Sequence, residues 1–148
     1  MERRKPASGV LISNTQPTIV FLTVCTAQRQ PWLTNPIAKK ILLQSWADAD
    51  AWLIGHYLLM PDHLHCFCAP QKLEITLDRW ITYWKSRFTA NSPDPSWKWQ
   101  AHKWDTRLRK SENYQEKWNY VRQNPVRKAL IAHPDDWPHQ GTLNELRG

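Results

Sequence analysis

Residues 52–69 have the sequence WLIGHYLLMPDHLHCFCA, and this stretch decides the fold of the chain. Trp52 to Met60 is an apolar run with the length of a buried strand, and Pro61-Asp62 interrupts it. His63 to Ala69 is a second such run. Two strands separated by two residues are typical of a β-hairpin. The stretch therefore predicts an antiparallel pair of strands.

The segments on both sides of this hairpin contain further strands and helices. Residues 18–26 (TIVFLTVCT) are mostly β-branched or aromatic, as in a buried strand, and Asn35-Pro36 suits a helix N-cap and first turn. In chain order, the predicted elements are a strand over 18–26, a helix over 36–49, strands over 52–60 and 63–69, a helix over 75–90, an extended segment over 98–109 and a helix over 111–123. This order predicts an α+β fold, a ferredoxin-like antiparallel sheet with helices packed on one face.

The length of 148 residues is that of one domain. We expect a basic, irregular N-terminal arm over 1–16, a single domain over 17–132 and an irregular C-terminal tail over 133–148. No apolar run is long enough for a membrane span, and no P-loop motif is present. Three cysteines, with no apolar segment after the charged N-terminus, favour a reducing cytoplasm over a secretory route.

Positive charge is concentrated in one part of the chain. The formal net charge is +7, and residues 79–128 alone contain twelve basic and four acidic residues, together with six of the ten tryptophans. Basic residues interleaved with aromatic ones suit a phosphate backbone with stackable bases, so we expect this segment to form one DNA-binding face. A charged surface over a tryptophan-rich core is the alternative. The candidate DNA-binding residues are Arg3, Arg4, Lys85, Arg87, Lys103, Trp104, Arg107, Arg109 and Arg122.

The triplet His63-Leu64-His65 lies on a predicted strand. Because side chains alternate along a strand, the two imidazoles share one face, where they can bind one divalent ion. Two unrelated histidines on a polar sheet face are the alternative. A zinc site that also includes Cys66 and Cys68 is disfavoured, since alternation places both thiols on the opposite face.

Tyr120 lies on the predicted helix over 111–123, away from its packing stripe. Tyr114, Trp118 and Val121 recur at helical spacing and form that stripe. Tyr120 points about 100° or more away from it, and Asn124 follows one turn later on the same side. Such a tyrosine is either a nucleophile beside a ligand or an ordinary surface residue.

These motifs together resemble a known family. Residues 58–65 (LLMPDHLH) resemble the "MPNHxH" signature of the HUH single-tyrosine transposases, and residues 119–126 (NYVRQNPV) resemble the helix that contains their nucleophile. The block over 99–114 and Asp136-Trp137-Pro138 are similar to two further motifs, so the resemblance covers roughly residues 17–138. The chain is most similar to the REP-associated tyrosine transposases. It departs from their pattern at Asp62, where the usual residue is Asn.

The resemblance implies a fold of the HUH endonuclease type and a chemistry. Tyr120 would be the nucleophile, and His63, His65 and Asn124 would hold a divalent metal ion, Mg²⁺ or Mn²⁺. The reaction would be cleavage and rejoining of single-stranded DNA through a 5′-phosphotyrosine, at hairpins formed by REP-like palindromes. The implied protein is bacterial, cytoplasmic and nucleoid-associated, binds no membrane, and is a monomer or a homodimer.

Two other functions remain possible from the sequence. The first is a nucleic-acid-binding protein on the same fold without cleavage activity, although such a protein has no need for all four of His63, His65, Tyr120 and Asn124. The second is an RNA-binding or RNA-cleaving protein of ferredoxin-like fold, which is disfavoured because the paired aromatic strand motifs of an RNA-recognition motif are missing.

Overall fold

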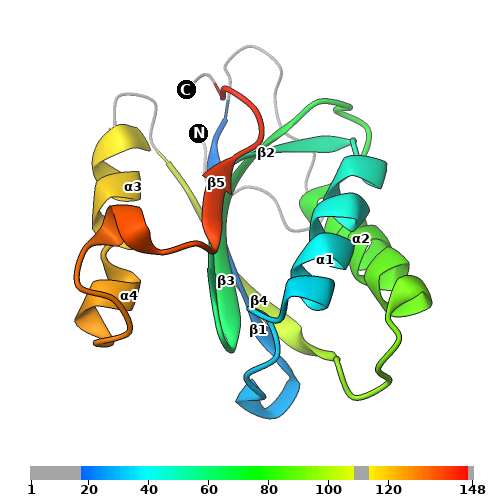
Figure 1. Cartoon of the computed structure of the whole chain (residues 1–148). Coiled ribbons are helices and arrows are strands. Elements are labelled where there is room, and N and C mark those ends of the chain that lie inside the picture. The colour runs from blue at the N-terminus through cyan, green and yellow to red at the C-terminus, as the bar shows by residue number, and fades with distance from the viewer. Residues whose placement is uncertain (1–17, 109–113, 147–148) are drawn as a thin grey trace.

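A computed structural model of the chain describes residues 18–108 and 114–146 (Figure 1). Its centre is a five-stranded sheet with the strand order β4-β1-β3-β2-β5, in which every neighbouring pair is antiparallel. The strands are β1 (Val20–Thr26), β2 (Trp52–Met60), β3 (His63–Pro70), β4 (Trp99–Arg107) and β5 (Gln140–Thr142). Strands β1 to β4 have the ferredoxin-like order, and β5 extends the sheet at the β2 edge.

Helices cover both faces of this sheet. The helices are α1 (Pro36–Asp48), α2 (Leu77–Asn91), α3 (Tyr114–Val121) and α4 (Asn124–Arg127), with 3-10 turns η1 (Ala27–Arg29) and η2 (Pro134–Asp136). Figure 1 shows α1 and α2 together on one side of the sheet and α3 and α4 on the other.

The starts of α1 and α2 are fixed by side-chain caps. The Asn35 side-chain oxygen accepts hydrogen bonds from the backbone N–H groups of Ile37 and Ala38, at 2.8 and 3.3 Å. The Thr76 hydroxyl accepts from the N–H of Arg79 at 3.2 Å. Each bond satisfies a backbone donor that has no partner inside the helix. The cap predicted at Asn35 is therefore confirmed.

The two faces of the sheet contain separate hydrophobic cores. The larger core lies under α1 and α2 and includes Leu64, Cys66, Trp80 and Trp84. The smaller core lies under α3 and η2 and includes Leu58, Met60, Phe67, Trp118 and Trp137. The α+β class and the antiparallel sheet are confirmed. The placement of all helices on one face is wrong for α3, because its stripe of Trp118 and Val121 packs on the opposite face.

The C-terminal tail predicted to be irregular contains ordered structure. The indole N–H of Trp137 donates to the backbone carbonyl of Leu59 at 3.0 Å, and residues 140–142 pair with β2. A three-residue strand has too short a pattern to be predicted from sequence. The predicted arm over 1–16 lies outside the described residues. Within residues 18–108 and 114–146, no helix is both long and apolar enough to cross a membrane.

Candidate functional site

Strand β3 presents its two histidines on the α3 face of the sheet. Leu64, Cys66 and Cys68 are in the core under α1 and α2, so His63, His65 and Phe67 point to the other face. The predicted alternation along this strand is confirmed. It also separates the buried thiols of Cys66 and Cys68 from the imidazoles, which excludes a joint zinc site of these four side chains.

The two imidazoles are held close together by hydrogen bonds to their Nδ1 atoms. Their ring centroids are 4.9 Å apart. Asp62 Oδ1 lies 2.8 Å from His63 Nδ1, and Thr23 Oγ1 lies 2.8 Å from His65 Nδ1. Because a carboxylate only accepts, Nδ1 of His63 bears the proton and Nε2 keeps its lone pair. In both rings Nε2 is the nitrogen left for a ligand, as in many metal-binding histidines.

Both histidines are uncharged at neutral pH. The pKa of His65 is lowered to about 3, chiefly by burial and to a smaller extent by His63, Lys117 and Arg127. Burial also lowers the pKa of His63, although the adjacent Asp62 opposes the shift. A neutral imidazole is the form that coordinates a metal ion. The electrostatics of the pair therefore suit the predicted ligands.

Asp62 belongs to a chain of contacts that reaches the β1–α1 loop. Arg29 Nε donates to Asp62 Oδ2 at 3.0 Å, while the other carboxylate oxygen of Asp62 bonds to His63. The Arg29 guanidinium also lies 3.4 Å from His63 Nδ1. These roles of Asp62 and Arg29 were not predicted from the sequence. The position of Asp62 directly before the histidine motif was the available signal.

Tyr120 lies in the last turn of α3 and is 63% exposed, so its predicted position off the packing stripe is confirmed. The guanidinium of Arg127 lies 4.3 Å from the centre of its ring. The same guanidinium donates to the backbone carbonyl of Tyr120 and to Asn124 Oδ1. Arg127 thus holds Tyr120 and Asn124 together at the junction of α3 and α4.

Tyr120 and Asn124 are on the same side of the sheet as the histidines (Figure 1). Within the described part of the chain, no hydrogen bond or ring contact connects either residue to His63 or His65. The link is electrostatic, since Arg127 and Lys117 influence His65 and Lys128 influences His63. Lys117 also lies 4.9 Å above the ring of Phe21, which stacks on His65 at 5.2 Å.

Besides Arg29, the basic residues that influence the histidine pair are therefore Lys117, Arg127 and Lys128, which were not singled out from the sequence. Lys117 precedes Tyr120 by three positions and Arg127 follows it by seven, so both lie near the tyrosine in sequence. That proximity was the usable signal. A phosphate at the histidines would meet three cationic side chains from α3 and the α4 region.

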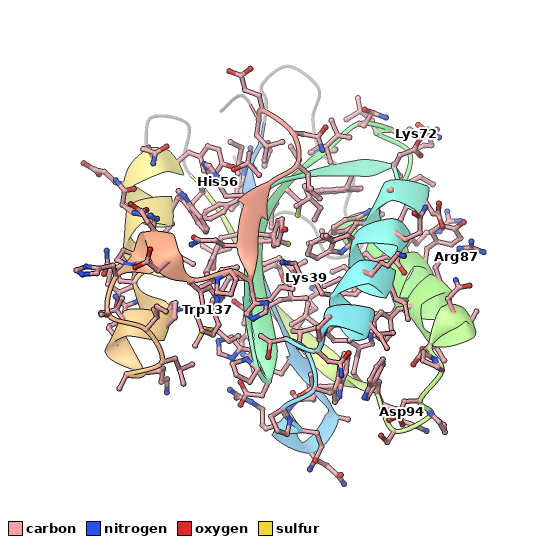
Figure 2. All side chains as sticks on the ribbon, viewed as in Figure 1. Lys39, His56, Lys72, Arg87, Asp94 and Trp137 are labelled. Carbon is pink, nitrogen blue, oxygen red and sulfur yellow. The ribbon has the colours of Figure 1, made fainter. Side chains whose placement is uncertain are left out.

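The prediction that residues 79–128 form one DNA-binding face is wrong. Helix α2 packs on the face opposite the histidines, and there Arg87 pairs with Asp48 at 3.1 Å and Lys85 donates to the Gln100 carbonyl at 2.8 Å. Figure 2 shows Arg87 beside α1 and α2, across the sheet from His56 and Trp137. The segment passes from one side of the sheet to the other through β4, so its charge is divided between both.

The two basic residues of β4, Lys103 and Arg107, lie on the α2 face of the sheet. Lys103 lies opposite Val24 and binds Asp78 of α2 at 3.1 Å and Asp105 at 2.8 Å, with its side chain 15% exposed. Arg107 lies opposite Val20, whose side chain is in the larger core. Both therefore alternate toward the α2 face, away from the histidines.

Trp104 and Arg122 are the predicted DNA-binding residues that lie on the histidine side. Thr23 is opposite His65 on one side and Trp104 on the other, so the three share one face, and Trp104 is 55% exposed. Arg122 follows α3 and pairs with Asp135. Arg3, Arg4 and Arg109 lie outside the described residues. Trp104 is thus an accessible aromatic in the same row as a candidate ligand.

The neighbouring tyrosine of α3 is not available as a nucleophile. The hydroxyl oxygen of Tyr114 accepts a hydrogen bond from the backbone N–H of His56 at 3.0 Å, and burial raises its pKa. Figure 2 shows His56 on the side of α3. The contact fixes α3 to β2, so Tyr114 has a structural role.

A metal site built only from His, Cys, Asp and Glu is not formed. Among residues 18–108 and 114–146, no group of three or more such side chains could hold an ion. A metal ion at the histidine pair would therefore have few protein ligands, of which Asn124 is the predicted third. Such a site leaves positions for phosphate oxygens.

Comparisons with known proteins agree with the fold. No protein-family model matches the chain, and no curated protein matches it. A solved structure of a REP-associated tyrosine transposase bound to a REP hairpin is 20% identical, with a TM-score of 0.72 over 93% of this chain and 82% of that one. A transposase structure from Deinococcus radiodurans R1 is 16% identical, with a TM-score of 0.51 over 82% of this chain and 97% of that one. The chain has the fold of these transposases.

Proposed function

We propose that this chain is a metal-dependent single-stranded DNA transesterase of the REP-associated tyrosine transposase family, a transposition-related enzyme that acts at REP-type palindromic hairpins. The observation that favours it most is the neutral histidine pair on the same side of the sheet as the Tyr120 helix. The structural neighbour bound to a REP hairpin supports the choice of substrate.

In this proposal, the reaction is an exchange of phosphodiester bonds. The hydroxyl oxygen of Tyr120 attacks the scissile phosphorus, the bond from phosphorus to the 3′-oxygen breaks, and the 5′-phosphate stays on the tyrosine. The phenol loses its proton, and the leaving 3′-oxygen gains one. Rejoining reverses these steps, so no nucleotide cofactor is consumed.

The chain's own residues would position the strand for this attack. Arg127 fixes the ring of Tyr120 from above, and Lys117 and Lys128 add positive charge near the histidines. These cations suit a phosphate held at His63 and His65. The exposed ring of Trp104, two strands from His65, is placed to stack on an unpaired base.

The site residues fit a divalent ion. Asp62 and Thr23 occupy the Nδ1 atoms, so Nε2 of each imidazole is the nitrogen available as a ligand, and Asn124 would add an oxygen. A bound Mg²⁺ or Mn²⁺ would supply Lewis-acid polarisation of the phosphate. In this structure the Asn124 oxygen accepts a hydrogen bond from Arg127.

That last contact favours one other function. With the Asn124 oxygen bound to Arg127, only the two histidines would remain as protein ligands for an ion. A nucleic-acid-binding protein on the same fold, without cleavage activity, would tolerate this arrangement. The two functions differ in whether DNA becomes covalently attached.

A covalent-adduct assay separates them. We expect a labelled hairpin with single-stranded flanks to give a denaturation-resistant adduct with the wild type, and Tyr120→Phe to abolish it while binding stays intact. Tyr83→Phe is the matched control, because Tyr83 is exposed on α2, across the sheet from the histidines. A chelator should stop the reaction, and Mg²⁺ or Mn²⁺ should restore it.

Three results would contradict the proposal. An undiminished adduct with Tyr120→Phe would place the nucleophile elsewhere. Full activity in chelator would remove the metal from the mechanism. Tight hairpin binding without any adduct, across oligonucleotides that carry genomic palindromes, would favour the binding protein.

A further inference from the structure

A cavity of about 510 Å³ lies at one end of the sheet, between the β1–α1 loop and the segment before β4. Its lining residues are Ala27, Gln28, Gln30, Pro31, Trp32, Ser96, Trp97 and Lys98. The two sides are joined by a backbone hydrogen bond of 2.8 Å from the N–H of Ala27 to the carbonyl of Lys98. This bond joins the two segments that line the cavity, one after β1 and one before β4.

One wall of this cavity is a stacked aromatic pair. The rings of Trp32 and Trp97 lie 5.8 Å apart with an interplanar angle of 18°. Trp97 is half-buried, and Trp32 is buried with an indole nitrogen that has no hydrogen-bond partner among the described residues. An aromatic ring backed by a second parallel ring is a rigid platform for a planar group.

The rest of the lining is polar and cationic. Gln28, Gln30, Ser96 and Lys98 are all exposed. A glutamine side chain offers both a donor and an acceptor, which matches the edge of a nucleobase. Lys98 offers an ammonium group for a phosphate. This combination suits one nucleotide better than an apolar ligand.

The loop that forms the cavity also reaches the histidine site. Gln28 and Arg29 both have left-handed backbone conformations, with φ of 56° and 55°. Such conformations are unfavourable for residues with a Cβ atom, and they concentrate at functional sites. Gln28 and Gln30 line the cavity, while Arg29 between them binds Asp62 and approaches His63. Adjacent residues of one loop therefore connect the cavity to the proposed site of phosphate attack.

We propose that this cavity binds one unpaired base of the single-stranded DNA flank, next to the nucleotide whose phosphate is at the histidine pair. The base stacks on Trp97, the glutamines bond to its edge, and Lys98 binds its phosphate. This proposal rests on the proposed function for the identity of the strand. It adds a second point of contact, which fixes the register of the strand relative to Tyr120.

Photocrosslinking with the full chain tests it. The probe is a hairpin with randomised single-stranded flanks in which 5-iodouracil replaces thymine, and crosslinked tryptic peptides are mapped by mass spectrometry. We expect a crosslink in the peptide of residues 88–98, whose one tryptophan is Trp97. Trp97→Leu should remove it. Tyr83→Leu is the matched control, because Tyr83 is an exposed aromatic that does not line the cavity.

A binding comparison covers the case in which Trp97→Leu does not fold. The wild type should bind a hairpin with base-containing flanks at least about tenfold more tightly than one with abasic flanks, because Trp97 and Trp104 would each stack on a base. Gln28→Ala changes an exposed side chain and should reduce this ratio by about threefold, as for one hydrogen bond.

The outcomes distinguish this proposal from the proposed function. Crosslinks found elsewhere, such as at Trp104, with none at Trp97, would overturn the cavity, as would equal affinity for both kinds of flank. Tyr120 adduct formation is scored on the same samples. A Trp97 crosslink without an adduct would support the cavity and contradict the transesterase, and an adduct without the crosslink would do the reverse.

Discussion

The orientation of the His63 ring is fixed by the residue that precedes it. Asp62 bonds to its Nδ1 and is itself held by Arg29, so the ring presents Nε2 in one orientation. A carboxylate behind a histidine ligand orients the ring and increases its basicity. An asparagine at this position would offer its amide oxygen to the same hydrogen bond without the charge.

The contact predicts a difference between two Asp62 variants. Asp62→Ala removes the acceptor and should weaken binding of Mn²⁺ by about 10–100-fold. Asp62→Asn keeps an acceptor and should lie close to the wild type. Titration of Mn²⁺ by calorimetry, without DNA, measures the effect apart from catalysis. Equal affinities in Asp62→Ala and the wild type would leave Asp62 with no role at the metal.

At the scale of elements, one of the contacts that position α3 requires the glycine at position 55 of β2. A Cβ atom at Gly55 would lie 2.8 Å from Leu146 Cδ1 and closer still to the hydroxyl of Tyr114. That hydroxyl accepts from the N–H of His56, so the first residue of α3 rests directly on the backbone of β2. The tyrosine at the other end of α3 is positioned through this contact.

We therefore expect Gly55→Ala to destabilise the protein by about 1–3 kcal/mol through overpacking, and to lower the yield of adduct. Tyr114→Phe alone should cost about 1 kcal/mol, because the His56 N–H loses its acceptor. The double variant should cost less than the sum, since loss of the Tyr114 hydroxyl leaves room beside the new methyl group. Urea unfolding measures all three, and additive costs would show that the two positions do not interact.

At the scale of the whole molecule, the sequence predicted the antiparallel sheet well. It did not predict which face of the sheet each helix covers. The hairpin of β2 and β3 follows from apolar runs and a two-residue break, which are local signals. The face that α3 covers and the pairing of β5 are decided by packing of Trp118 and Trp137 against distant strands. The shared face of His63 and His65 and the position of Tyr120 off the packing stripe were also predicted, because both follow from local periodicity. The contacts of Arg127 and Asp62 could not be predicted, because they depend on the three-dimensional arrangement.

The half-buried histidines predict how stability depends on pH. Burial lowers the pKa of His56, His63, His65 and His139 in the folded protein. Below an unfolded pKa of about 6.5, the unfolded chain binds more protons, so folding is progressively weakened as the pH falls toward the folded values, about 3 for His65. For His65, which has the largest shift, this weakens folding by up to about 1.4 kcal/mol per pH unit between these two pKa values.

We expect the urea midpoint to fall between pH 7 and pH 5. His56→Phe should make the urea midpoint less dependent on pH, because one histidine with a lowered pKa is removed. The phenyl ring can keep the stacking contact with Trp118, whose ring centre lies 4.6 Å from that of His56. His102→Phe, at an exposed position of β4, is the comparison for loss of a histidine. A midpoint that is constant or rises toward pH 5 would contradict the lowered pKa values of these rings.

The strand order has a kinetic consequence. The pairing of β1 with β4 brings Val20 to Arg107. The pairing of β2 with β5 joins residues 86 positions apart, as between His56 and Thr142. Closing such long loops costs entropy before any pairing is gained, which slows folding. The hairpin of β2 and β3, with neighbours in sequence, is the one part of the sheet that can form early. We therefore expect folding on the scale of milliseconds to seconds. Until β1 and β5 pair with this hairpin, both of its edges can pair with other chains.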